Sequence, residues 1–270
     1  MHRPAGWLSE SLPWDDSIGL PDLERRRAIE CRLTSDHALG TIEEAAGFLA
    51  ERGLFTRMPD CALPSLFGAC HEEPARAGGR GFDLWPKTRW IWSFQLARLP
   101  GVLHTKLHRG KSLYLSTEGA RVFDPLVRRA IADASGDDAA LLKHLGQHGP
   151  SMSADLELEL GWDGKRLKGS RQRLERVGAL VSDGLVFDDD SNGHFAPLRR
   201  WDQVFARAVA AREPLADVVV AGVRAAVIAP EANIRTWFSW PIPTGMVDRL
   251  VASGRLARPK PGYLAIDPSL

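Results

Sequence analysis

The chain has 270 residues, of which 44% are hydrophobic and 26% charged, with a formal net charge of +1. A chain of this length and composition can bury a sizeable core and is long enough for two or three modules. No apolar run approaches the roughly 20 residues that a membrane-spanning helix needs, so we expect no membrane partner. The first residues lack the cationic start and continuous apolar block of a secretory signal, and we therefore expect a cytoplasmic protein.

The cysteines and the common motifs give no sign of a cofactor. Cys31, Cys61 and Cys70 show no CxxC spacing, and together with His37 and His71 they match no zinc pattern, so we interpret them as buried thiols and expect no metal. The sequence contains no Walker loop, Rossmann fingerprint, Gly-x-Ser-x-Gly elbow or His-Glu-x-x-His pair. This excludes the easily recognised nucleotide-binding, hydrolase and metalloprotease classes, and we expect neither a nucleotide nor another cofactor.

In chain order, the first region (1–73) contains a predicted helix that closes at Gly53 and runs directly into a short apolar strand. An inserted region (74–135) opens with a Gly-rich loop. It continues with two predicted strands between Val102 and Leu115 and a helix from Thr117 to Asp133, capped by Ser116 or Thr117.

The central region (136–200) carries the most informative order of elements. A polar helix start at Ser151 leads to Gly161-Trp162-Asp163-Gly164, then to a basic helix and a Gly-containing hairpin. This order is typical of a winged helix-turn-helix. The last region (201–270) repeats part of it, with a helical stripe from Met246 to Val251 and a hairpin turn at Pro259-Lys260-Pro261-Gly262. We therefore predict an α+β, mainly helical fold built from tandem winged helix-turn-helix modules over 1–73, 136–200 and 201–270.

The basic helix concentrates positive charge on one element. It holds six cations against a single acid, Glu175, a surplus of +5 in a chain whose total is +1. The cations are Lys165, Arg166, Lys168, Arg171, Arg173 and Arg176. A basic stripe on the second helix of a helix-turn-helix is the electrostatic pattern expected of a nucleic-acid reader.

The periodicity of this helix separates a packing face from a free face. Leu167, Leu174, Val177 and Gly178 recur at helical spacing and are expected to be buried. On the remaining arc, we expect phosphate contacts from the cations Lys165, Arg166, Lys168, Arg173 and Arg176. Arg171 or Gln172 is expected to reach a base edge. The alternative is a solvated basic helix without a ligand, and Asp188-Asp189-Asp190 in the hairpin would be repelled by DNA.

Other candidate site residues are few. Trp90 and Trp92, beside Lys87 and Arg89, suit stacking on an exposed base, although alternating Trp residues also suit the buried face of a strand. His104 and His108 lie four apart in a predicted strand, hence on one face, without a Cys, Asp or Glu at ligand spacing. Gln95 could offer a polar group but is more typical of a surface position.

Several stretches together resemble the winged-helix proteins related to the bacterial AlkZ/YcaQ DNA glycosylases. The resembling stretches are Glu44-Ala45-Ala46-Gly47-Phe48-Leu49, Gly53-Leu54-Phe55, Pro64-Ser65-Leu66-Phe67, Trp90-Ile91-Trp92, His148-Gly149-Pro150 and the unit from Val247 to Ile266. The resemblance implies tandem winged helices and removal of alkylated or crosslinked bases from DNA.

The catalytic residues of that family do not carry over. The resemblance implies a Gln-hydrophobic-Gln or Gln-hydrophobic-Asp pair before a Pro, and the matching stretch here is Thr56-Arg57-Met58-Pro59. A thioether at Met58 cannot accept a proton from water, so the family reaction is not expected in its known form. The main prediction is therefore a duplex-DNA-binding protein. The alternatives are a divergent DNA glycosylase that flips a damaged base, and a scaffold that binds a protein partner.

Overall fold

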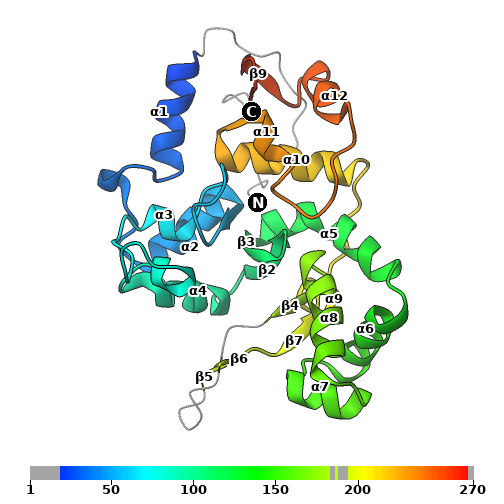
Figure 1. Ribbon diagram of the computed structural model, residues 1–270. Helices are drawn as coiled ribbons and strands as arrows, with labels where there is room; N and C mark the ends of the chain where they lie inside the picture. Colours follow the sequence, from blue (N-terminus) through cyan, green and yellow to red (C-terminus); the bar gives the residue numbers. More distant parts are fainter. Residues whose placement is uncertain (1–18, 183–185, 188–193, 267–270) are drawn as a thin grey trace, which may run out of the picture.

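The computed structural model describes residues 19–182, 186–187 and 194–266, and it shows helices arranged around small antiparallel sheets (Figure 1). The predicted α+β, mainly helical class is confirmed at this level. Within the described residues, no helix is both long and apolar enough to cross a membrane.

The first group of elements contains one three-stranded sheet and several helices, of which the first packs elsewhere, with Leu23 against Ile228 and Ala265. Its longer helices are α1 (Leu20–Glu30) and α2 (Ile42–Arg52), followed by β1 (Leu54–Thr56), α3 (Leu66–Ala69), α4 (Trp92–Gln95), β2 (Val102–His108) and β3 (Lys111–Ser116). Short 3-10 turns lie at Ser35–His37, Gly81–Leu84, Arg89–Ile91 and Leu96–Arg98. The strand order is β1-β3-β2, with Leu54 opposite Leu115. One sheet therefore joins the regions 1–73 and 74–135, which were predicted to be separate.

The second group begins after α5 (Thr117–Ala132), whose first turn is capped by the Ser116 hydroxyl, as predicted. It contains α6 (Gly136–His148), α7 (Ser153–Leu160), α8 (Gly164–Arg176), β4 (Leu180–Ser182), β5 (Val186–Phe187), β6 (His194–Phe195) and β7 (Leu198–Arg200). Strand β7 pairs with β4, and an antiparallel bridge from Leu198 to Ser151 adds a third position on its other side. The short helix α9 (Trp201–Val204) follows.

The third group contains α10 (Pro214–Ala226), β8 (Ile228–Pro230), α11 (Glu231–Ile234), α12 (Met246–Ala252), β9 (Ala257–Lys260) and β10 (Tyr263–Ala265). The helix predicted from Met246 and the hairpin turn predicted at Pro259–Gly262 are both present. The strand order is β8-β10-β9.

The two three-stranded sheets share one strand order, β1-β3-β2 and β8-β10-β9, in which the last strand lies in the middle. In the second group β7 pairs with β4, and the isolated bridge to Ser151 lies on its other side, at the position of an outer strand. As predicted, α2 ends at Gly53 and is followed directly by a short apolar strand. This strand pairs with β3, and the hairpin is formed by β2 and β3. In this repeated order, α2 corresponds to α6 rather than to α8.

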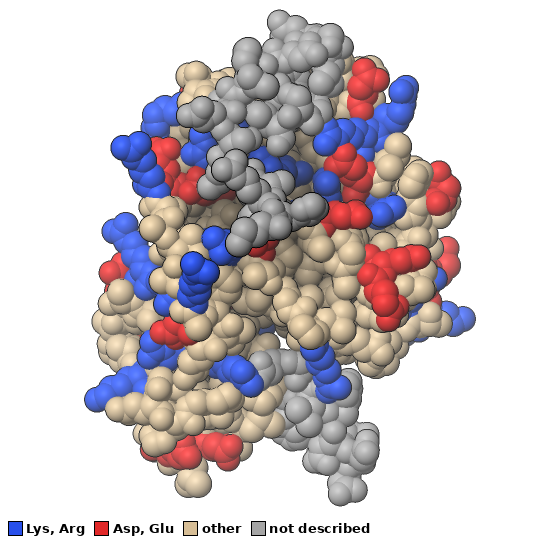
Figure 2. Space-filling view, turned by 180° about the vertical axis from the view of Figure 1, so that it is seen from behind, with Lys and Arg blue, Asp and Glu red and all other residues tan. Residues whose placement is uncertain are grey.

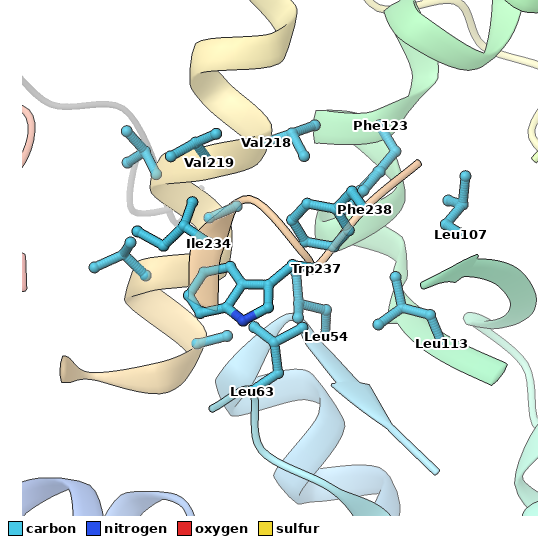
Figure 3. Close-up of a cluster of buried hydrophobic side chains, with 14 of the residues drawn as sticks. Leu54, Leu63, Leu107, Leu113, Phe123, Val218, Val219, Ile234, Trp237 and Phe238 are labelled. Carbon is cyan, nitrogen blue, oxygen red and sulfur yellow. The ribbon is translucent and has the colours of Figure 1, made fainter. Parts of the chain in front are cut away.

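The largest hydrophobic cluster joins the first and third groups. Figure 3 shows Trp237 and Phe238 packed among side chains from β1, β3, α5 and α10. Trp237 is fully buried, and a Cβ built at Gly222 of α10 would lie only 2.8 Å from its ring. A separate core, centred on Leu141, Leu156 and Leu174, holds α6, α7 and α8 together. The basic helix thus belongs to a subcore of its own.

Candidate nucleic-acid interface

Helix α8 begins with a defined turn after α7. Helix α7 ends at Gly161, whose φ of 62° is the left-handed conformation that glycine adopts without strain. Asp163 then caps α8, since its carboxylate accepts a hydrogen bond from the Arg166 amide at 2.7 Å. The two helices are therefore joined by a three-residue turn, Gly161 to Asp163, which the sequence pattern indicated.

One face of α8 is buried, as predicted from its periodicity. Leu167 and Leu174 are each 2% exposed and pack with Leu141, Leu145 and Leu156 of the neighbouring helices. Ser170, on the same face, is buried and donates to Asp138 of α6 at 2.7 Å. Packing on α6 and α7 therefore orients α8, and the remaining arc faces outward.

The flank of α8 next to α6 is neutralised by two acids. Arg166 makes two hydrogen bonds to Asp137, at 2.6 and 3.0 Å, and Arg173 makes two to Asp138, at 2.6 and 3.0 Å. Hydrogen bonds from Arg166 lower the pKa of Asp137 below its ordinary value, and those to Asp138 raise the pKa of Arg173. These two arginines, predicted to contact phosphate, thus already have carboxylate partners.

The opposite flank of α8 packs on strand β2. Glu175 is 2% exposed and accepts hydrogen bonds from Lys106 at 2.5 Å and from Arg171 at 2.9 Å. Arg171 also lies 3.4 Å from the Ser153 hydroxyl of α7. Arg171 is therefore half-buried and held by neighbours, rather than directed outward as expected of a residue that reads a base edge.

A cleft of about 320 Å³ lies along this flank, between α7, α8 and β2. Its polar lining includes Lys106, Glu157, Lys168, Arg171 and Gln172. Lys106 of β2 adds a cation from a different group of elements. Its proximity to α8 could not be read from the sequence, because 69 residues separate it from Glu175.

The central stripe of α8 remains open. Lys165, Lys168, Gln172 and Arg176 are exposed, and their spacing places them along one side of the helix. Among the described residues, the three cations of this stripe have no acidic partner within ion-pair distance. Gly169 lies on the same side, contributes no side chain and is half-buried. The open stripe carries three cations rather than the six counted in the sequence.

The face shown in Figure 2 carries acidic and basic side chains interspersed, without a continuous basic surface. Acids elsewhere also pair with cations, as Asp217 does with Arg255 at 2.5 Å and Glu231 with Arg258 at 3.0 Å. The predicted acidic hairpin residues, Asp188 to Asp190, lie outside the described residues.

Trp90 and Trp92, the residues predicted to stack on an exposed base, do not lie in a strand. Trp90 lies in a 3-10 turn and Trp92 begins α4, because the Ser93 hydroxyl bonds back to the Trp90 carbonyl at 3.0 Å. Trp90 is 39% exposed and packs edge-on against Phe94, whereas Trp92 is half-buried with the Arg89 guanidinium 5.2 Å from its ring centre. The two rings therefore do not alternate on the face of a strand.

Thr56 and Met58, at the catalytic positions that the resemblance implies, both make contacts within the fold. Thr56 is 1% exposed, and its hydroxyl donates to the Met58 carbonyl at 2.8 Å. Met58 packs against the cluster that includes Phe48 and Phe55. Gln95 lies exposed at the end of α4.

The two histidines of β2 are also separated by the structure. The β2–β3 register shifts between Thr105 and His108, which breaks the alternation that would place both histidines on one face. His104 stacks on Tyr114 with ring centres 4.9 Å apart, and His108 bonds to the Trp237 carbonyl. The expectation of a shared face is wrong for this reason.

Comparisons with protein-family models, with curated proteins and with solved structures find no match to this chain. The resemblance to AlkZ/YcaQ-related proteins therefore stays a prediction from the sequence.

Proposed function

We propose that residues 136–200 form a winged helix-turn-helix module that binds duplex DNA through α8. The order of elements supports this proposal: a first helix α6, a bridge at Ser151, the pair α7 and α8, and then β4 and β7 flanking the short β5–β6 pair. In winged helices the second helix of the pair enters the major groove. The same strand order in the other two groups supports a tandem arrangement.

The observation that carries the proposal is the exposed stripe of α8. Lys165, Lys168 and Arg176 lie on it without an acidic partner among the described residues, while the cations on both flanks are paired. Unpaired cations release condensed counterions when they meet phosphates, which favours binding. Gln172, in the middle of the stripe, is the side chain placed to reach a base edge, where glutamine recognises adenine.

The test is fluorescence anisotropy of a labelled duplex over a salt series. The triple variant Lys165→Gln, Lys168→Gln and Arg176→Gln is compared with wild type, and the slope of log K against log salt is expected to fall by about three, one for each lost phosphate contact. A matched control replaces three exposed cations outside this module, Arg25, Arg129 and Lys260, by Gln. It changes the net charge equally and is expected to bind within about twofold of wild type.

Two outcomes would reject the proposal. The first is that the wild-type protein binds no duplex at low salt. That result would favour the alternative that these modules bind a protein partner. The second is equal weakening by the triple variant and its control. A single-turnover assay on alkylated and crosslinked duplexes addresses the glycosylase alternative, since a binding protein leaves the damaged base attached.

A further inference from the structure

Three side chains that can bind a metal ion meet where β2 ends. Asp60 and Cys61 lie in the loop after β1, and His108 is the last residue of β2. One ligating atom from each, the Asp60 carboxylate oxygen, the Cys61 Sγ and a His108 ring nitrogen, lies within 4.8 Å of the other two. A backbone hydrogen bond from Arg57 to Ser112 holds this loop against the β2–β3 hairpin.

The His108 ring is fixed in one orientation. Its Nδ1 lies 2.6 Å from the Trp237 carbonyl oxygen, which can only accept a hydrogen bond, so Nδ1 carries a proton and donates it. Trp237 is itself immobilised in the core beside Leu54 and Leu63 (Figure 3). A histidine that donates one ring N–H to a backbone carbonyl and presents its other nitrogen is the usual arrangement around a bound metal.

The free nitrogen of His108 faces a carboxylate. Nε2 lies 3.3 Å from Oδ1 of Asp60, and the His108 side chain is only 6% exposed. A lone pair and a carboxylate oxygen at this distance repel unless a proton or a cation lies between them. A metal ion shared by the two residues would remove this repulsion.

The distances suit a tetrahedral ion. Zinc binds nitrogen and carboxylate oxygen at about 2.0–2.2 Å, which places two such ligands roughly 3.3–3.5 Å apart. The observed separation of 3.3 Å between Asp60 and His108 is already in this range. The Cys61 sulfur would need to approach by a distance on the order of 1 Å, which is a rotamer-scale adjustment in a loop.

We propose that Asp60, Cys61 and His108 form a binding site for a zinc-class divalent cation. A combination of thiolate, imidazole and carboxylate favours zinc over the hard cations magnesium and calcium. On binding, the Cys61 thiol loses its proton to solvent as the sulfur–metal bond forms, and a water molecule completes the four ligands. Asp60 is exposed and Cys61 half-buried, so the ion can enter from solvent while His108 anchors it from inside.

Lys111 opposes this site electrostatically. Its ammonium group pairs with Oδ2 of Asp60, leaving Oδ1 directed at His108. A lysine here repels a dication and competes for the carboxylate. Removal of Lys111 is therefore expected to tighten metal binding, whereas it would weaken an arrangement held only by ion pairs.

The experiment titrates the purified full chain with Zn²⁺ in competition with a chromophoric chelator, and with Co²⁺ followed by absorption. The expected result is one equivalent of metal per chain and a thiolate-to-cobalt charge-transfer band, which histidine and carboxylate ligands alone do not give. Cys61→Ser is expected to abolish that band. It is also expected to weaken zinc binding by more than roughly 100-fold, because losing only a residue that hydrogen-bonds a metal ligand already weakens binding by roughly 10–100-fold. Lys111→Ala is expected to strengthen zinc binding.

Two further variants keep the test specific. His108→Asn retains an amide donor for the Trp237 carbonyl but removes Nε2, so it is expected to lose the metal and stay folded by circular dichroism. Cys70→Ser, at a buried thiol outside this cluster, is expected to bind metal like wild type. Absence of saturable binding by wild type, or an unchanged cobalt band in Cys61→Ser, would overturn the proposal and leave these residues with polar contacts alone.

Discussion

Lys106 and Glu175 form an ion pair that joins the β2 strand to the basic helix, with Nζ and Oε2 2.5 Å apart. The Glu175 side chain is 3% exposed, whereas that of Lys106 is 31% exposed. The same carboxylate accepts hydrogen bonds from Arg171 and from the Ser182 hydroxyl. Glu175 thus adds a buried polar contact between α8 and β2, and it holds the C-terminal end of α8 against that strand.

Glu175→Gln is expected to lower the free energy of unfolding by about 1–3 kcal/mol, measured by urea denaturation. The amide removes the charge that offsets Lys106 and Arg171, while the partial exposure of both partners keeps the cost below that of a fully buried pair. Glu51→Gln is the control, because Glu51 pairs with Arg32 at 3.7 Å with 57% of its side chain exposed. Its effect is expected to be about 0.5 kcal/mol or less, and equal losses in the two variants would contradict the assigned role of Glu175.

Gly178→Ala is expected to destabilise the protein by about 1–3 kcal/mol. Gly178 has a φ of +75°, and an added Cβ would lie 2.9 Å from Leu107 and 3.0 Å from Val127. Gly169→Ala provides a contrast inside α8, since the added Cβ would lie 3.5 Å from the Arg173 side chain, an ordinary van der Waals distance. Alanine there is expected to stabilise the helix by about 0.5–1 kcal/mol. Thermal denaturation of both variants checks the opposite signs.

Asp137→Asn tests whether α6 limits the charge that α8 offers to DNA. The change frees Arg166 from its hydrogen-bonded carboxylate, and a freed arginine can contact one more phosphate. Duplex affinity at low salt is expected to rise, and the salt dependence to steepen by about one. Asp133→Asn, which removes an equally negative charge paired with Arg129 outside this module, serves as the control. Equal tightening by both variants would indicate a general effect of net charge.

The His104 ring links stability to pH. Burial, with the charges of Arg57 and Lys106, lowers the pKa of His104 from 6.5 to about 3. Between pH 3 and pH 6.5 the unfolded chain binds a proton at His104 that the folded chain does not bind. The contribution of His104 to the free energy of unfolding is therefore complete above about pH 6.5 and declines as the pH falls toward 3. His104→Gln is expected to reduce the slope of unfolding free energy against pH in this window, by at most about 1.4 kcal/mol per pH unit. Urea denaturation between pH 4 and 8 measures it, and parallel curves for the two proteins would exclude this role of His104.

Local signals in the sequence predicted local structure well. The cap at Ser116, the turn at Gly161 and the hairpin at Pro259–Gly262 were all expected, because capping groups and turn residues act over a few positions. The buried face of α8 followed from helical spacing for the same reason. By contrast, the spacing of Trp90 and Trp92 covers too few residues to separate a strand from a turn, and the alternative of a buried strand face does not hold, because Trp90 lies in a 3-10 turn.

The contacts between distant parts of the chain could not be predicted in this way. Nothing in the residues around Leu54 specifies that its strand pairs with Leu115, and nothing in α8 indicates that α6 supplies partners for Arg166 and Arg173. These pairings depend on the tertiary arrangement, which a count of charges along the chain does not contain. The sequence therefore located the candidate helix, whereas the structure determined which of its cations remain available.

The strand order common to the two three-stranded sheets has a consequence for synthesis of the protein. In each of them the central strand is the last of the three to leave the ribosome, so neither outer strand has its sheet partner until then. Strand β1 is complete at Thr56, but its partner β3 begins only at Lys111. At an elongation rate of about 5–20 residues per second, an apolar strand edge stays unpaired for several seconds. This interval is when the nascent chain is most open to intermolecular pairing and to capture by chaperones.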